Sequence, residues 1–224
     1  MLDLRCHACG AFIRDRVPTL NLFSALWGIF ESPSKAFLRI ARSEQKNYVH
    51  LLFALQGPLL LAIVLSAARA GDLGYPFGIL LLLIGAAGPL LGLMLLPLGV
   101  LLTRFILRRT VQAGLRYRDV AAFIAYGLSP LMWASVIVLP LQLGLFGLTL
   151  FSTNPPGWQV QPLPFWMLTS LDGIAIAWSG LLLPRSLAVY NVPFGRSMLL
   201  YLPFWGYLIG CTSGFALLLP AIRF

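Results

Sequence analysis

The residues best suited to metal chemistry lie near the start of the chain, in the sequence CHACG at positions 6–10. Two cysteines separated by two residues, and followed by a glycine that permits a tight turn, resemble the knuckle motif whose thiolates bind a zinc ion. Structural zinc takes four ligands, and neither His7 nor the third cysteine, Cys211, is placed to complete the set. Cys6 and Cys9 therefore form half a site. Zinc completed by a partner, zinc shared between two copies of the chain, and a pair of reduced cytosolic thiols all stay open.

A second chemical candidate is Asp172, which lies inside an apolar stretch. Ionisable groups at membrane depth are costly and often functional. At 1.5 Å per helical residue, Asp172 is expected ~10 Å below the outer membrane surface, with Arg69 as its expected partner. Gln56 and Gln142 are further polar insertions. A structural ion pair and a transport pathway are both open, although a pathway normally shows several such groups along one route.

Enzyme chemistry is not expected. The sequence contains no HExxH, no GxSxG elbow, no P-loop and no second aspartate for an intramembrane protease dyad. His7 and His50 are too scattered to form a general-base constellation.

The elements that must position these groups are apolar stretches long enough to cross a bilayer. Apolar residues make up 59% of the 224 residues and charged residues 10%. This composition is too hydrophobic for a water-soluble monomer. A hydrocarbon core about 30 Å thick needs ~20 helical residues. The sequence therefore predicts an all-α membrane protein with five transmembrane helices, at roughly Tyr48–Ala68, Gly78–Thr103, Val120–Gln142, Phe165–Pro184 and Met198–Pro220.

Positive charge falls on alternate loops. Only Arg69 and Arg223 lie on one side of the predicted membrane. By the positive-inside rule, the N-terminus is cytoplasmic and the C-terminus external. Anionic inner-leaflet lipids account for the net charge of +9, so nucleic-acid binding is not expected. The other side holds Arg5, Arg14, Arg16, Lys35, Arg39, Arg42 and Lys46 before the first span, Arg104, Arg108, Arg109, Arg116 and Arg118 after the second, and Arg185 and Arg196 after the fourth.

The segment between the knuckle and the first span carries two helical patterns. The first gathers Leu22, Phe23, Leu26, Trp27 and Phe30 on one face. The second begins with Ser32 as N-cap and Pro33 at the first helical position. Its basic stripe suits either the membrane interface, facing lipid phosphates, or packing against the spans. The stripe consists of Lys35, Arg39, Arg42 and Lys46.

Small residues at helical spacing predict close helix packing in the second and fifth spans. In lipid, helices approach closely where glycines allow backbone contact. The spacing does not decide whether the contact lies within one chain or between copies. The glycines are Gly85, Gly88 and Gly92, and Gly206, Gly210 and Gly214.

Three segments resemble the Yip (Ypt-interacting protein) domain family of multispanning membrane proteins. They are LWGIFESPSKAFLRIAR at 26–42, YRDVAAFIAYGLSPLMWA at 117–134, and IAWSGLLLPRSLAVYNVPFGRSMLLYLP at 176–203. The resemblance covers roughly Leu22 to Leu218 and implies five helices, a cytoplasmic N-terminus and a non-enzymatic role. The CxxC head looks like that of bacterial members, some of which carry a cysteine-rich zinc ribbon ahead of the domain, but it has one cysteine pair instead of two.

These observations predict three parts: a cytoplasmic CxxC knuckle at 1–20, an amphipathic interfacial segment at 21–47, and a five-helix membrane domain at 48–224. The expected function is a non-enzymatic scaffold, adaptor or accessory subunit of the bacterial cytoplasmic membrane. Its expected partners are anionic lipids and either another protein or a second copy. The alternative is a small transporter or channel that uses Asp172.

Overall fold

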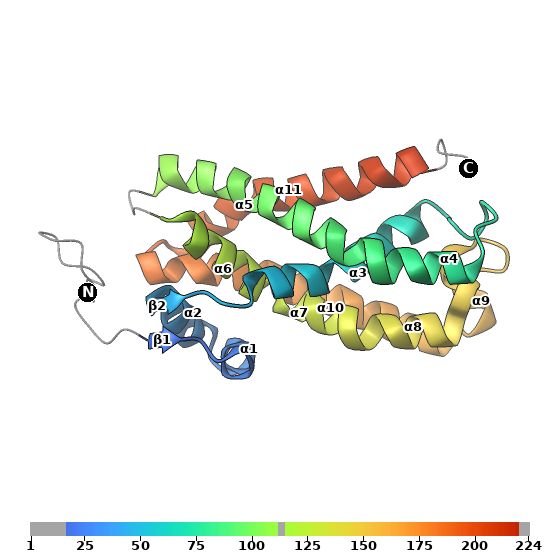
Figure 1. The fold of residues 1–224 in the computed structure, drawn as a ribbon, viewed down its shortest axis with the longest axis horizontal. Helices are drawn as coiled ribbons and strands as arrows, with labels where there is room; N and C mark the ends of the chain where they lie inside the picture. Colours follow the sequence, from blue (N-terminus) through green and yellow to red (C-terminus); the bar gives the residue numbers. More distant parts are fainter. Residues whose placement is uncertain (1–16, 112–114, 220–224) are drawn as a thin grey trace, which may run out of the picture.

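The structure is a computed structural model, and it describes residues 17–111 and 115–219. The chain enters through a small head made of β1 (Val17–Thr19), α1 (Leu22–Glu31), α2 (Pro33–Arg42) and β2 (Ser43–Gln45), in which the two short strands pair in parallel. Asn21 caps α1, because its side-chain oxygen accepts a hydrogen bond from the Ser24 amide at 3.3 Å. In Figure 1, α1 is seen almost end-on, so it lies across the long axis of the molecule.

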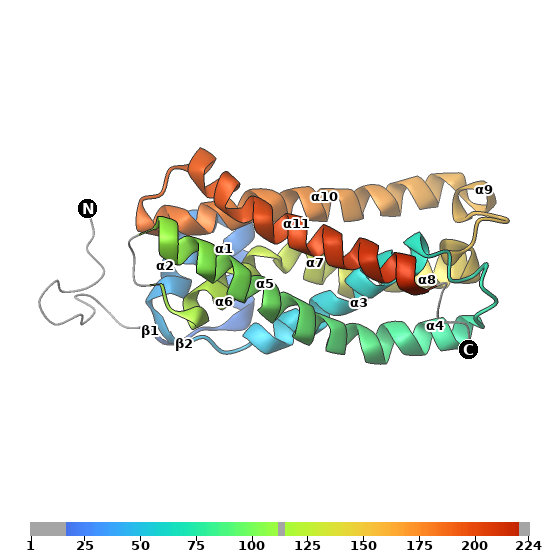
Figure 2. The same cartoon turned by 90° about the horizontal axis from the view of Figure 1, so that it is seen from above.

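Five helical segments are long and apolar enough to cross a membrane. They run side by side along the long axis, with the head at one end and the end of the last helix at the other (Figures 1 and 2). The segments are α3 (Val49–Ala67); α4 (Phe77–Leu82), η1 (Leu83–Ala87) and α5 (Gly88–Thr110); α7 (Ser129–Trp133), η2 (Ala134–Val138), α8 (Leu139–Phe146) and η3 (Gly147–Phe151); α10 (Pro162–Ser186) with η4 (Leu187–Tyr190); and α11 (Phe194–Leu218).

The third span differs most from the sequence-based expectation. The apolar stretch Val120–Gln142 is not one helix: α6 (Tyr117–Gly127) ends before Leu128, and the long apolar segment runs from Ser129 to Phe151. Pro130 has no amide hydrogen to continue the α6 ladder, and Leu128 departs from helical geometry at φ −87° and ψ 11°. From Val120 to Leu128 every side chain is buried, so α6 is the centre of the head end of the bundle and not a lipid-facing helix.

Two other prolines coincide with π-helical turns. The π-helical turn η1 directly precedes Gly88 and Pro89, and η2 ends two residues before Pro140. Because a proline ring removes one hydrogen bond and clashes with the preceding turn, a wider turn is a common local solution. Pro58 and Pro97 lie inside α3 and α5, which continue through them.

The backbones of α3 and α5 meet at glycines. A Cβ atom built on Gly57 would lie 2.0 Å from the Gly88 carbonyl oxygen, and one on Gly92 would lie 2.1 Å from the Phe53 carbonyl oxygen. Gly57, Gly88 and Gly92 therefore form a close backbone contact between α3 and α5 within the chain.

The other expected packing glycines differ. A Cβ atom on any of them would meet no atom within 4 Å, so they make no close helix contact within the described chain. The glycine row of α11 faces away from the bundle because that helix packs through the other side, with Tyr201, Phe204 and Leu208 buried. These glycines are Gly85, Gly206, Gly210 and Gly214.

The end of the bundle opposite the head is closed by a loop contact. The Asp72 carboxylate accepts hydrogen bonds from the Thr153 amide at 3.0 and 3.1 Å, and the Gly71 amide donates to the Phe151 carbonyl at 3.0 Å. The hydrogen bonds from Thr153 lower the pKa of Asp72 below its usual 3.8. Because a lowered pKa favours the charged form, this contact is complete at neutral pH and weakens only in acid, as pH falls through the lowered value.

The short α9 (Gly157–Val160) follows this contact and precedes α10. Trp158 and Trp166 are largely exposed there, at the end of the bundle where interfacial aromatic residues are expected.

Candidate functional site

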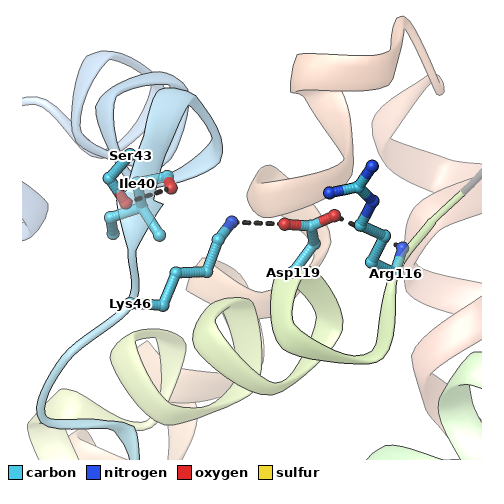
Figure 3. A network of polar contacts seen from close by, with 5 residues as sticks. All are labelled: Ile40, Ser43, Lys46, Arg116 and Asp119. Carbon is cyan, nitrogen blue, oxygen red and sulfur yellow. Dashed lines mark hydrogen bonds and ion pairs between the residues drawn. The ribbon is translucent and has the colours of Figure 1, made fainter. Parts of the chain in front are cut away.

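The junction between the head and the bundle is built around an ion pair. Lys46 follows β2, and its ammonium group pairs with the Asp119 carboxylate in the first turn of α6 (Figure 3). The other Asp119 oxygen accepts a hydrogen bond from the Arg116 amide at 3.3 Å, which caps the start of α6. The two side chains are only 6% and 12% exposed, so the charges depend on one another.

Aromatic packing surrounds this ion pair. The Phe37 ring of α2 meets the edge of the Phe123 ring of α6, with centroids 6.0 Å apart, and the Lys46 ammonium lies 6.0 Å from the Phe123 centroid. The Tyr126 hydroxyl donates to the Asn47 carbonyl at 3.4 Å. The head is therefore fixed onto the bundle by apolar, ionic and hydrogen-bond contacts together.

A cavity of about 310 Å³ opens beside the ion pair. Its walls come from the β2–α3 connection, the first turns of α3 and the start of α6. Burial raises the pKa of the Tyr117 hydroxyl above its usual 10.0, which disfavours its deprotonation further. The lining residues are Glu44, Gln45, Lys46, Asn47, Val49, His50, Phe53, Tyr117, Arg118 and Ala121.

Lys46 does not belong to the expected basic stripe. The α2 helix ends at Arg42, because Ser43 is extended and starts β2, and the turn of the chain carries Lys46 inward to Asp119. Lys35 and Arg39 are exposed, and Arg42 is half-buried. Arg39 also donates to the Ser24 hydroxyl at 3.3 Å, which links α2 to α1.

The two faces of α1 are distinct. Ala25, Leu26 and Ile29 are buried, whereas the rings of Phe23, Trp27 and Phe30 point outward with 68%, 65% and 43% of their surface exposed. The expected apolar face is thus divided, with Leu26 turned toward the protein. We call Phe23, Trp27 and Phe30 the aromatic face of α1.

Asp172 lies on α10 and is bound to Gln142 of α8. The Gln142 amide nitrogen donates to Asp172 Oδ2 at 2.6 Å, and Asp172 Oδ1 is buried without a hydrogen-bond partner among the described residues. The expected partner, Arg69, is elsewhere: it lies in the α3–α4 loop, where its charge acts on Asp72. The expected ion pair between Arg69 and Asp172 is thus replaced by two separate interactions, one of Asp172 with Gln142 and one of Arg69 with Asp72.

Gln56 supports the break in the third span. Its side-chain amide donates to the Ala125 carbonyl of α6 at 2.9 Å, and the side chain is 1% exposed. A carbonyl near the end of an interrupted helix needs such a partner in a dry environment. Sequence reasoning noted Gln56 and Gln142 as polar insertions but not what they bind.

No protein-family model, no curated protein and no solved structure matches the chain. The resemblance to the Yip domain family therefore stays a prediction.

The metal prediction falls largely outside the described residues. Cys6, His7 and Cys9 are not among them, while Cys211 lies on α11 as a free thiol. Within residues 17–111 and 115–219, no group of three or more His, Cys, Asp or Glu side chains is placed to hold a metal ion. Zinc bound by Cys6 and Cys9, with a partner or a second copy, stays a prediction.

Proposed function

We propose that this protein is a non-enzymatic scaffold or adaptor of the bacterial cytoplasmic membrane, which presents its head to another component at the cytoplasmic surface. The observation that supports this proposal is the fixed head: Lys46, Asp119 and the Phe37–Phe123 contact hold it against the bundle. A rigid platform suits recruitment better than a head on a free linker, because less conformational entropy is lost when a partner binds.

The proposed orientation uses the distribution of charge along the bundle. Among the described residues, Arg69 lies at the end opposite the head, and the remaining basic residues lie at the head end. Translocation of cationic loops is disfavoured, so the head end is assigned to the cytoplasm. The head-end residues are Lys35, Arg39, Arg42, Lys46, Arg104, Arg108, Arg109, Arg116, Arg118, Arg185 and Arg196.

The head itself suits the membrane interface. The α1 helix lies across the bundle axis and directs its aromatic face outward, and Lys35 and Arg39 are exposed on α2. Aromatic rings at the acyl boundary and cations on anionic lipid phosphates are the features of an interfacial helix. Contact with lipid would fix the distance between the membrane and the part of the head surface that is left for a partner.

Crosslinking from defined positions tests the scaffold proposal. A photo-crosslinking residue in place of Gln45, which is exposed on β2 of the head and lies outside the basic stripe, is expected to give a discrete protein adduct in native membranes, either with another protein or with a second copy. The matched control replaces Leu199 on α11, which is exposed on the membrane-spanning surface and should give lipid adducts only. Recovery of monomer alone from position 45, in quantitative crosslinking and affinity purification, would contradict the proposal.

A transporter or channel is the second candidate, and the pairing of Asp172 with Gln142 inside the bundle favours it. Flux through protein-containing liposomes is then expected to depend on Asp172. Unaltered flux in Asp172→Asn, or no flux in the natural protein, removes this candidate.

A further inference from the structure

The half of the bundle away from the head contains a lateral cavity of about 500 Å³. One wall is the second half of α3, the opposite wall is the first half of α10, and Gln142 of α8 and Leu150 of η3 close it between them. Its lining is mainly aliphatic and aromatic, with Ser66, Thr169 and Asp172 as further polar members. The lining residues are Leu59, Ala62, Ile63, Ser66, Ala67, Gln142, Leu150, Phe165, Thr169, Asp172, Gly173 and Ile176.

The polar side chains of this cavity differ in their hydrogen bonding. The Ser66 hydroxyl donates to the Leu150 carbonyl at 3.2 Å. Asp172 has one oxygen bound to Gln142, whose side chain is 5% exposed, while the other oxygen has no hydrogen-bond partner among the described residues. Gln142 therefore fixes the position of the carboxylate without neutralising it, since an amide carries no charge.

The mouth of the cavity faces the lipid. Ile63 and Ile176 line it and are exposed on the outer surface of α3 and α10, within segments long and apolar enough to cross a membrane. A molecule that enters by this route must first dissolve in the hydrocarbon, so its body is apolar. A cation on that body would be attracted to Asp172 strongly, because the effective dielectric constant is low away from water.

We propose that this cavity is a binding site for a small apolar molecule carrying one positive charge, such as a lipophilic ammonium compound, which enters sideways from the bilayer. Asp172 supplies the counter-charge, Gln142 orients the carboxylate, and the aliphatic and aromatic walls bury the body of the ligand. The site goes beyond the scaffold proposal and does not depend on it. Binding without flux would keep the site and remove only the transporter candidate.

Binding of 1-adamantylammonium to the full-length protein in an uncharged detergent tests the site, with isothermal titration calorimetry as the measurement. We expect saturable binding of one molecule per chain. Adamantane-1-carboxylate, which has the same cage and the opposite charge, is expected not to bind. Equal binding of the two compounds, or no saturable binding of the ammonium compound, would overturn the proposal.

Two variants separate charge from shape. Asp172→Asn retains an oxygen that can accept the Gln142 hydrogen bond, and we expect it to weaken ammonium binding at least about tenfold, as loss of a buried charge partner does. Gly173→Leu fills the cavity from its wall, where a Cβ atom has open space, and should abolish binding with the carboxylate in place.

The matched control is Gly180→Leu on the same helix. Gly180 also has open space for a Cβ atom but does not line the cavity. The Gly180→Leu variant should bind the ammonium compound as tightly as the natural protein does. Unchanged binding in Asp172→Asn or in Gly173→Leu would contradict the proposed site.

Discussion

Asp119→Asn is expected to lower the free energy of unfolding by about 3 kcal/mol or more, because it removes the carboxylate from a largely buried ion pair. The two side chains are 6% and 12% exposed, so most of the surface of the ion pair is shielded from water. The asparagine side chain can still accept from the Arg116 amide, so the helix cap is retained. Equilibrium unfolding in mixed detergent micelles measures the change.

A double-mutant cycle distinguishes the ion pair from general damage. The cycle combines Lys46→Met with Asp119→Asn, and the double variant is expected to be markedly more stable than Asp119→Asn alone, since the buried ammonium group is removed together with its carboxylate partner. Lys35→Met removes an exposed lysine of the same head and should change stability by less than about 0.5 kcal/mol. A double variant no more stable than Asp119→Asn would show that the pair is not what holds the junction.

The five long helices could be predicted because bilayer thickness imposes a length of apolar sequence that can be counted directly. The interruption at Gly127–Pro130 could not be predicted with the same certainty. Proline inside an apolar stretch is compatible with several backbone geometries. The α5 helix continues through Pro97, the π-helical turn η1 comes just before Pro89, and the helix breaks just before Pro130. Tertiary partners such as Gln56, which binds Ala125, decide among them.

The direction in which residues face was harder to predict than their helices. In a soluble protein the polar face of a helix marks its exposed side, but in a bilayer both the lipid-facing and the buried side are apolar. Hence the sequence did not distinguish α6, which is buried from Val120 to its end, from its lipid-exposed neighbours. It also did not distinguish the glycines of α5 from those of α11.

The candidate sites were predicted only in part. The four basic residues Lys35, Arg39, Arg42 and Lys46 would share one face only if a single helix contained them all. The α2 helix ends earlier, because β2 begins three residues before Lys46. Asp172 stood out as a carboxylate in an apolar stretch, but its partner depends on how α8 and α10 are aligned, which spacing along one helix does not determine.

The second large effect is expected at the contact between α3 and α5. Gly92→Ala should reduce the free energy of unfolding by at least about 2 kcal/mol, since overpacking of a close contact costs this much even where neighbours can move. Here the added methyl group would lie 2.1 Å from the Phe53 carbonyl oxygen and 2.9 Å from the Gly57 Cα atom. Both are backbone atoms of α3, so the two helices must separate. The same unfolding measurement applies.

Gly210→Ala on α11 is the matched control, because a Cβ atom there has open space within the chain. Its effect on the unfolding of the monomer should stay within about 1 kcal/mol, the difference in helix propensity between glycine and alanine. Comparable losses in Gly92→Ala and Gly210→Ala would contradict the assignment of close packing to α3 and α5. Because the α11 glycine row is open, a loss in Gly210→Ala that appears only at high protein-to-detergent ratio would instead place that row between copies of the chain, since backbone contact between two helices needs the same absence of side chains.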